Sequence, residues 1–381
     1  MSGSRWISVK GFLLILIAGS AFLPAIQKGF RPFPVRGLDG YSEPNPFPAF
    51  HADSLFDGAW LPRVARHFDR GIGFHNLLVR LYNQIDFSLF HIIHARKVVI
   101  GKEDYLFEES YLTAFSGGDY IGSAIIEARS RQFRDVQERL KKEKDILFLV
   151  LLLPDKGTFY PEFLPDQYQR PAGTPTNYEG YREKLLEFGV NHIDFNAWFR
   201  AMKDTCRYPL YPKTGIHWSS YGSYLAFDSL TKYLSAVTGH SLPRARLSGI
   251  RVTGRAEGRD NDVERACNLL WSIPAPALAC PEVDFIPPAS PDPFSALIIG
   301  DSFYFIWAEA GYIGRTFANR DFWYYDHDVY SGTYHTGRKA TAMDLPGMLG
   351  RMNAVIIMQT NAGYGELGYY FTDRLLTKGG I

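Results

Sequence analysis

The sequence has few of the features that mark metal-binding or nucleic-acid-binding proteins. It contains three cysteines in 381 residues, and no group of Cys and His has the spacing of zinc ligands. Lys and Arg number 41 against 40 Asp and Glu, and no basic run would follow a phosphate backbone. We therefore expect no metal, no cofactor and no nucleic-acid partner.

A long apolar run stands near the N-terminus. Arg5 and Lys10 precede it, residues 11–26 form it, and Lys28 and Arg31 follow it. Its 16 residues exceed the apolar core of an ordinary signal peptide and fall a little short of the roughly 20 residues that cross a bilayer. We expect export with an uncleaved membrane anchor, and export with signal cleavage is the alternative. Either places the rest of the chain outside the cytoplasm.

Composition divides the chain into three parts. A signal anchor or signal peptide over residues 1–30 is followed by a linker rich in proline and glycine over 31–60 and a main domain over 61–381. Within that domain, residues 240–290 show no clear periodicity, so we expect a long insertion or an irregular subdomain there. In an exported chain Cys267 and Cys280 could form a disulfide, whereas Cys206 has no obvious partner.

The main domain alternates apolar runs with amphipathic segments. Residues 146–154 include no polar side chain, as in a strand buried on both faces of a parallel sheet. This order predicts a three-layer α/β fold with an open parallel sheet, in which reactive groups gather at the carboxyl ends of the strands. Further strands are expected at 190–195, 295–300 and 352–361, a hairpin at 97–109, and helices at 61–93, 125–144, 178–188 and 221–238.

A serine follows one of these strand ends. In "IIGDSF", Ser302 stands on a strand-to-loop bend, and its own backbone N–H could face an oxyanion. Gly300 and Asp301 precede it and are candidates for the oxyanion hole or for substrate binding. A serine hydroxyl becomes a good nucleophile when a neighbouring imidazole accepts its proton. By itself, a Gly-Asp-Ser triplet equally describes a helix N-cap after a core strand.

The stretch "TGIHWSSYG" offers that imidazole. His217 precedes an expected helix and stands next to Trp218. The structural alternative is a loop histidine packed against the adjacent indole, with the two serines capping the helix. The order of the segments favours the functional interpretation, because a buried strand ending in "PDKGTFYPEFLP" comes first, then this stretch, then "IIGDSF".

These segments resemble a known family. The markers "VVIGKEDYLF", "LPDKGTFYPEFLP", "KTGIHWSSYG" and "LIIGDSF" stand in the order found in the periplasmic O-acetyltransferases of the alginate type, and the resemblance covers residues 56–370. It implies a circularly permuted, SGNH hydrolase-like fold with Ser302 as nucleophile and His217 as general base. It also implies acetyl transfer to an exopolysaccharide outside the inner membrane, with a multi-spanning membrane acyltransferase delivering the acetyl group.

One residue of the family's site is missing. The family motif Asp-x-His-Trp places its acid at Gly215. Without an acid to orient the imidazole, we expect a loss on the order of a thousandfold or more, by analogy with serine proteases. Another carboxylate could replace it, and Asp194, Asp204 and Asp326 are the first candidates. A backbone carbonyl could instead hold the imidazole in a Ser-His dyad, or the site could be degenerate.

The sequence thus predicts an O-acetyltransferase or esterase in which Ser302 carries the acetyl group before a sugar hydroxyl accepts it. The alternative is a catalytically degenerate SGNH-like protein that binds polysaccharide or assembles an acetylation complex. Trp218 would wall the pocket, Lys156 would contact the polymer, and Asn361 would donate to an oxyanion or substrate. Each has a plainer interpretation, namely a packed indole, a solvated lysine and a turn asparagine. Residues 321–330 mix aromatics with acids, as in a sugar-binding wall or a core strand.

Overall fold

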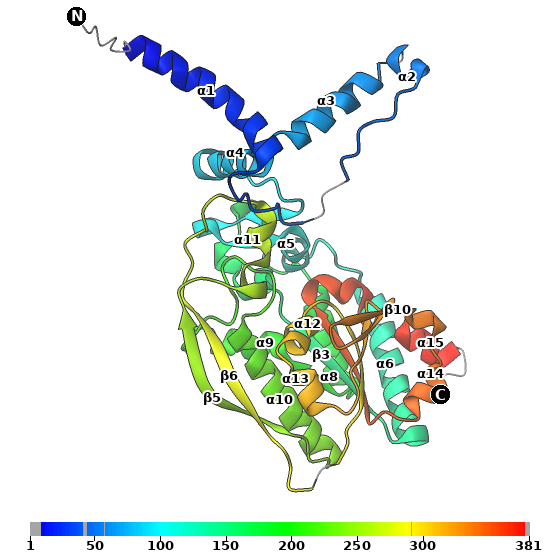
Figure 1. Ribbon diagram of the computed structural model, residues 1–381. Helices are drawn as coiled ribbons and strands as arrows, with labels where there is room; N and C mark the ends of the chain where they lie inside the picture. Colours follow the sequence, from blue (N-terminus) through cyan, green and yellow to red (C-terminus); the bar gives the residue numbers. More distant parts are fainter. Residues whose placement is uncertain (1–8, 41–43, 57, 291, 378–381) are drawn as a thin grey trace, which may run out of the picture. The chain divides into compact units, whose positions relative to one another are not determined.

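The structure is a computed structural model that describes residues 9–40, 44–56, 58–290 and 292–377 (Figure 1). The chain forms two compact units. The first consists of Met1–Ala95 with Glu264–Ser272, and the second of Arg96–Val263 with Ile273–Ile381. Residues 61–95, which were expected to open the main domain, therefore pack in the first unit.

The first unit is helical. Its described part contains α1 (Val9–Phe30), α2 (Ala52–Phe56), α3 (Trp60–Gly71) and α4 (His75–Phe90). Among the described residues, α1 is the one helix that is long and apolar enough to cross a membrane. One or two helices were expected over residues 61–93, and the structure has two, α3 and α4. Arg5 of the expected anchor lies outside the described residues.

A seven-stranded sheet forms the centre of the second unit, with the strand order β10-β9-β8-β7-β11-β3-β4. Strands β4, β3, β11, β7 and β8 run parallel, while at one edge β9 pairs antiparallel with β8 and β10 pairs antiparallel with β9. The expected parallel sheet is thus present in its central strands, and the sheet as a whole is mixed. The bounds are β3 (Leu147–Leu153), β4 (His192–Asp194), β7 (Ala296–Gly300), β8 (Asp321–Tyr324), β9 (Asp328–Ser331), β10 (Tyr334–Lys339) and β11 (Ala354–Thr360).

Helices cover both faces of the sheet and complete the three layers. Every residue of β3 is buried, and alternate side chains enter opposite cores: Leu149 and Leu151 face one, Phe148 and Val150 the other. The first core contains α5 (Glu109–Ser116), α7 (Lys156–Phe159), α9 (Phe195–Met202), α10 (Ser220–Thr238), α12 (Tyr304–Glu309) and α13 (Tyr312–Thr316). The second contains α6 (Ser123–Lys144), α8 (Asn177–Glu187), α14 (Leu345–Leu349) and α15 (Phe371–Thr377).

Polar N-caps start several of these helices beside the strand ends. Asp155 accepts a hydrogen bond from the N–H of Thr158 (2.7 Å) directly after β3, and Ser219 accepts one from the N–H of Gly222 (3.0 Å) at the start of α10. The cap at Ser219 was one of the interpretations of the sequence. It holds the chain two residues after His217.

The segment expected to be irregular is a regular ribbon. Strands β5 (Arg244–Thr253) and β6 (Leu278–Ile286) pair antiparallel, and they enclose a 3-10 turn (Gly258–Asn261) and α11 (Asp262–Cys267). The sequence did not predict this pairing because the ribbon is largely exposed, so its strands lack the apolar alternation of a half-buried sheet. All three cysteines are free, so the Cys267–Cys280 disulfide is not formed. The expected hairpin is present as β1 (Val98–Ile100) and β2 (Leu106–Glu108).

Gly300 ends β7 where the chain leaves room for no side chain, because an added Cβ would overlap the carbonyl oxygen of Met358 on β11. We expect Gly300→Ala to lower the free energy of unfolding by about 1–3 kcal/mol, since the two strands must separate. Urea denaturation measures the change. The control Gly254→Ala, where a Cβ meets nothing within 4 Å, should have an effect below about 0.5 kcal/mol. Equal effects in both variants would contradict the steric account.

Candidate active site

Ser302 lies at the carboxyl end of β7, in the turn that leads to α12, and its side chain is partly exposed. The backbone N–H of Asp301 donates to the carbonyl of Met358 (3.2 Å), which ties this turn to the neighbouring strand β11. The candidate nucleophile therefore stands on a braced bend at the sheet edge where parallel strands end.

His217 reaches this bend from the loop before α10. Its Nε2 lies 2.8 Å from the Oγ of Ser302, although 85 positions separate the two residues in the chain. The ring of Phe303 packs against the imidazole with centroids 5.0 Å apart. The side chain of His217 is almost fully buried, so its ring is held in one place with one nitrogen facing the serine.

The other imidazole nitrogen faces Asp262, the first residue of α11. His217 Nδ1 lies 2.8 Å from Asp262 Oδ2, while Asp262 Oδ1 accepts hydrogen bonds from the N–H groups of Ile216 (3.0 Å) and Val263 (2.8 Å). Burial by itself would raise the pKa of Asp262, but the hydrogen bond and charge of His217 and the two backbone donors outweigh it, and the net pKa lies below the ordinary value. The carboxylate is thus ionised and held through both oxygens.

Gly215 explains why the acid comes from another segment. A Cβ at this position would lie 2.7 Å from the carbonyl oxygens of both Arg259 and Asp260. The backbone just before Asp262 therefore fills the space into which a side chain at position 215 would extend. The absence of a side chain at position 215 thus allows the backbone before Asp262 to pack there, and Asp262 supplies the carboxylate instead.

The three acids that the sequence suggested lie elsewhere. Asp194 caps α9 through the N–H of Ala197 (2.8 Å), Asp326 forms an ion pair with Arg374, and Asp204 is exposed in a turn after α9. A substitute carboxylate was one of three explanations for the missing acid, and these three candidate positions were wrong. Asp262 was missed because it belongs to the segment taken as irregular, and only its cluster of acids, "RDND", would have drawn attention to it.

Asp301 braces the active-site turn instead of facing a substrate. Its Oδ1 accepts from the N–H of Phe303 (3.1 Å) and its Oδ2 from the N–H of Thr360 (2.8 Å) at the end of β11. The side chain is buried, and burial raises its pKa. The expected contact of Asp301 with an oxyanion or substrate is therefore corrected to a structural role, as is that of Gly300, which allows the close approach of β11.

Lys156 is fully buried, which contradicts the expected contact with a polymer. Its Nζ donates to the carbonyl oxygens of Leu106 (2.7 Å), Lys213 (2.6 Å) and Gly215 (3.0 Å), which uses all three protons. Burial lowers its pKa well below the ordinary value. Lys156 thus holds the loop that carries His217 and has no proton left for a ligand.

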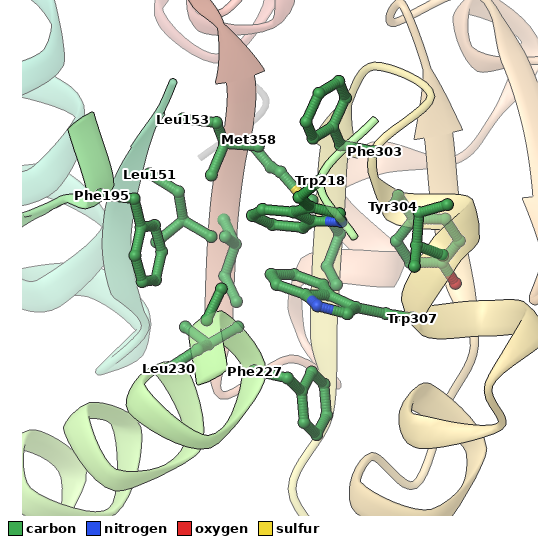
Figure 2. Close-up of a cluster of buried hydrophobic side chains, with 14 of the residues drawn as sticks. Leu151, Leu153, Phe195, Trp218, Phe227, Leu230, Phe303, Tyr304, Trp307 and Met358 are labelled. Atoms are coloured by element: carbon green, nitrogen blue, oxygen red, sulfur yellow. The ribbon is translucent and has the colours of Figure 1, made fainter. Parts of the chain in front are cut away.

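Trp218 is also part of the core and not a pocket wall, since its side chain is 1% exposed. Figure 2 shows its indole beside Phe303 and Trp307, with ring centroids 5.2 and 5.1 Å away. Trp218 in the core and the Ser219 cap thus both anchor the chain directly after His217. The plainer interpretation of Trp218 is the correct one.

Asn361 follows the end of β11 and faces a cavity of about 450 Å³. Its Nδ2 donates to Thr158 Oγ1 (2.9 Å), and its buried Oδ1 has no hydrogen-bond partner. The other residues around the cavity lie between Ala114 and Lys203. Within the described part of the chain, no hydrogen bond joins Asn361 to Ser302 or His217.

An exposed tyrosine stands beside the strand end that carries Ser302. Tyr325 and Asp326 form the centre of the turn between β8 and β9, both with positive φ (51° and 53°), a region that favours glycine or asparagine. The N–H of Tyr325 donates to the carbonyl of Gly300 (2.9 Å), and its ring contacts Tyr324 and Tyr369 with centroids 4.2 and 5.6 Å apart. The chain thus holds an exposed ring in an unfavourable backbone conformation, and the backbone of this residue is bonded to Gly300, two residues before the candidate nucleophile.

Comparison with known families agrees with this architecture. Residues 98–278 match the SGNH hydrolase-like domain of the acetyltransferase AlgX. The chain has an SGNH hydrolase-like fold and resembles the alginate-type O-acetyltransferases. The matched part of the SGNH-like fold contains His217 and Asp262, and Ser302 follows it in the chain. Comparison with curated protein sequences gives no match.

Three solved structures are similar to the SGNH-like chain. The O-acetyltransferase domain of Pseudomonas putida AlgJ is 15% identical with a TM-score of 0.48, covering 70% of this chain and 92% of that one. AlgX of Pseudomonas aeruginosa is 14% identical with a TM-score of 0.44, covering 76% and 69%. PatB1 of Bacillus cereus, solved with a sulfonyl adduct, is 11% identical with a TM-score of 0.44, covering 70% and 97%.

The crowding at Gly215 predicts that returning the acid to the family's position will harm the protein. In Gly215→Asp, the new side chain must displace the carbonyls of Arg259 and Asp260, and with them Asp262. We expect a loss of about 1–3 kcal/mol in the free energy of unfolding, measured by urea denaturation. Gly254→Asp, at an open position, is the matched control. A Gly215→Asp protein as stable as the wild type would refute this packing.

Asp260 predicts a pH dependence of stability. Burial, with the nearby charge of Asp262, raises its pKa to about 6, although Ser220 and His217 lower it in part. Between pH values of about 4 and 6 the unfolded chain releases this proton while the native chain keeps it, so stability falls as the pH rises. Asp260→Asn should remove about 2–3 kcal/mol of that fall. Denaturation across this range, with the exposed Asp204→Asn as control, measures it; parallel curves for wild type and Asp260→Asn would contradict the assignment.

Proposed function

We propose that this protein is an O-acetyltransferase that transfers acetyl groups to a polysaccharide through Ser302, His217 and Asp262. The observation that carries the proposal is the continuous row of hydrogen bonds from a partly exposed serine through a buried histidine to an ionised aspartate. Such a row, at the strand ends of an SGNH-like fold, is the arrangement that makes a serine hydroxyl nucleophilic. The match to the acetyltransferase AlgX domain supports acetyl as the transferred group.

In the first half-reaction, Ser302 Oγ attacks the carbonyl carbon of an acetyl donor while His217 Nε2 takes the hydroxyl proton. Asp262 stabilises the imidazolium that forms, because its Oδ2 accepts the hydrogen bond from Nδ1. When the tetrahedral intermediate collapses, the bond to the donor group breaks and His217 returns the proton to that leaving group. The acetyl group is then an ester on Ser302.

In the second half-reaction, a sugar hydroxyl attacks the acetyl ester and gives its proton to His217 Nε2. Collapse of the second intermediate breaks the bond to Oγ, and His217 returns the proton to Ser302. The same three side chains therefore serve both steps in opposite directions. Hydrolysis would use the identical site with water in place of the sugar.

The negative oxygen of both intermediates requires a fixed donor. Among the hydrogen bonds of the described residues, none has the backbone N–H of Ser302 as its donor. This N–H belongs to the turn that Asp301 holds through Phe303 and Thr360, so its position is fixed before a substrate arrives. We assign the N–H of Ser302 as the oxyanion donor.

The exposed ring of Tyr325 supports a glycan as acceptor. It is 48% exposed, and its backbone is bonded to Gly300, two residues before the nucleophile. Flat aromatic rings pack well against the apolar faces of sugar rings.

We place the reaction in the periplasm, with α1 as the anchor in the inner membrane. The length and apolar character of α1 support a membrane span. The acetyl donor would then be supplied across the membrane by a membrane-bound acyltransferase. An exopolysaccharide passing through the same compartment would be the acceptor.

Hydrolysis of 4-nitrophenyl acetate and labelling with phenylmethylsulfonyl fluoride test the site. We expect Ser302→Ala and His217→Ala to lower the hydrolysis rate by at least about a thousandfold, and Asp262→Asn by a similar factor, because each removes a member of one unit. Mass spectrometry should find the sulfonyl group of the inhibitor on Ser302 of the wild type.

Ser248→Ala, at an exposed serine of β5, is the control and should keep full activity. Circular dichroism confirms that each variant is folded. Hydrolysis that is unchanged in all four variants, together with no labelling of Ser302, would refute the enzyme and favour a polysaccharide-binding scaffold.

A further inference from the structure

Helix α4 exposes its apolar stripe to the surface. Its apolar residues Leu77, Leu81, Ile85 and Leu89 recur every fourth position and form one stripe along the helix. Each of them is between 40% and 70% exposed. An ordinary surface helix of a soluble domain buries such a stripe and exposes its polar face.

The buried side of α4 consists of Phe87 and three polar residues. Arg80 donates to the carbonyls of Leu269 (3.2 Å) and Gly37 (2.7 Å), and Asn83 donates to that of Cys267 (2.9 Å). The Oε1 of Gln84 accepts from the N–H groups of Leu270 (3.1 Å) and Trp271 (3.0 Å). These contacts fix the rotation of α4 about its own axis. The apolar stripe, on the opposite side, therefore faces outward.

The stripe begins next to the end of the candidate membrane span. The chain just before α4 packs on the last turns of α1: a Cβ at Gly73 would overlap the carbonyl of Pro24, and the rings of Phe33 and Phe74 lie 6.0 Å apart. The side chain of Gln27 in α1 also holds the backbone of Phe33 through two hydrogen bonds. The exposed apolar face of α4 therefore starts next to the C-terminal end of α1, where the chain would leave the membrane.

Helix α3 precedes the turn at Gly73 that packs on α1. Its composition is that of a membrane-surface helix. None of its residues is buried, and its apolar side carries Leu61 and Phe68, which are 58% and 55% exposed. Its opposite side carries Arg63, Arg66 and Arg70. Arginine on one face and apolar side chains on the other suit an interface that is apolar inside and anionic at its surface.

We propose that α4 and α3 lie in the interface of an anionic lipid bilayer, with the outward stripe of α4 and the apolar side of α3 reaching the acyl-chain boundary. Continuity with α1 favours lipid over a second copy of the chain, because a helix that leaves the bilayer brings the following turn and both helices to its surface. The arginines of α3 add electrostatic attraction to anionic headgroups. The proposal does not depend on acetyl transfer, but it depends on α1 crossing the membrane.

A fluorescent label quenched by lipids that carry a nitroxide on their acyl chains tests the proposal. The full chain, with Cys206→Ser, Cys267→Ala and Cys280→Ser, is reconstituted in vesicles of phosphatidylcholine and phosphatidylglycerol. Single cysteines labelled with the fluorophore NBD are then placed by Ile15→Cys in α1, Ile85→Cys in α4 and Leu61→Cys in α3. We expect strong quenching at all three positions.

Lys142→Cys, on the exposed end of α6, is the matched control and should not be quenched. Quenching at Ile15→Cys without quenching at Ile85→Cys overturns the proposal and leaves the anchor standing. A shielded label at Ile85→Cys that lipid does not quench means that a second copy covers the stripe, which also overturns it. No quenching at Ile15→Cys refutes the anchor itself. Removal of phosphatidylglycerol should weaken quenching at Leu61→Cys, and an unchanged signal there would exclude the anionic contribution.

Discussion

The candidate site depends on one close approach, that of the backbone at Arg259 and Asp260 to Gly215. Because position 215 carries no side chain, the segment before α11 can close on the histidine loop and bring Asp262 to His217 Nδ1. Lys156 holds the same loop by donating a hydrogen bond to the carbonyl of Gly215. A buried ammonium and an ionised carboxylate thus flank one short loop, and the imidazole is held between fixed partners.

The sheet supplies the second half of the arrangement. Strands β7 and β11 run parallel and end together, so Asp301 can bridge from the nucleophile turn to the N–H of Thr360. Its buried carboxylate would be costly without these backbone donors. Asp301 therefore holds the turn rigid, and the hydroxyl of Ser302 forms its hydrogen bond with His217.

Helix α4 of the first unit has a different pattern of burial from the helices of the second unit. In α4, arginine, asparagine and glutamine form the inward face together with Phe87, and leucine and isoleucine form the outward one, which is largely the reverse of a soluble helix. The reversal is possible because the segment 267–271 offers backbone carbonyls and N–H groups that these long polar side chains can satisfy. An apolar surrounding for the outward face accounts for both halves of the pattern.

The sequence by itself determined the local elements and the two ends that meet at the site. The unbroken apolar run of β3, the helix after His217 and the bend at Ser302 could be predicted, because periodicity and caps are properties of neighbouring residues. Only the tertiary structure decided that Asp262 is the acid, that Lys156 and Trp218 are buried, that residues 244–286 form a ribbon, and that α4 turns its leucines outward. Each of these results depends on contacts between segments far apart in the chain, and local sequence patterns do not specify which distant backbone will fill a given space.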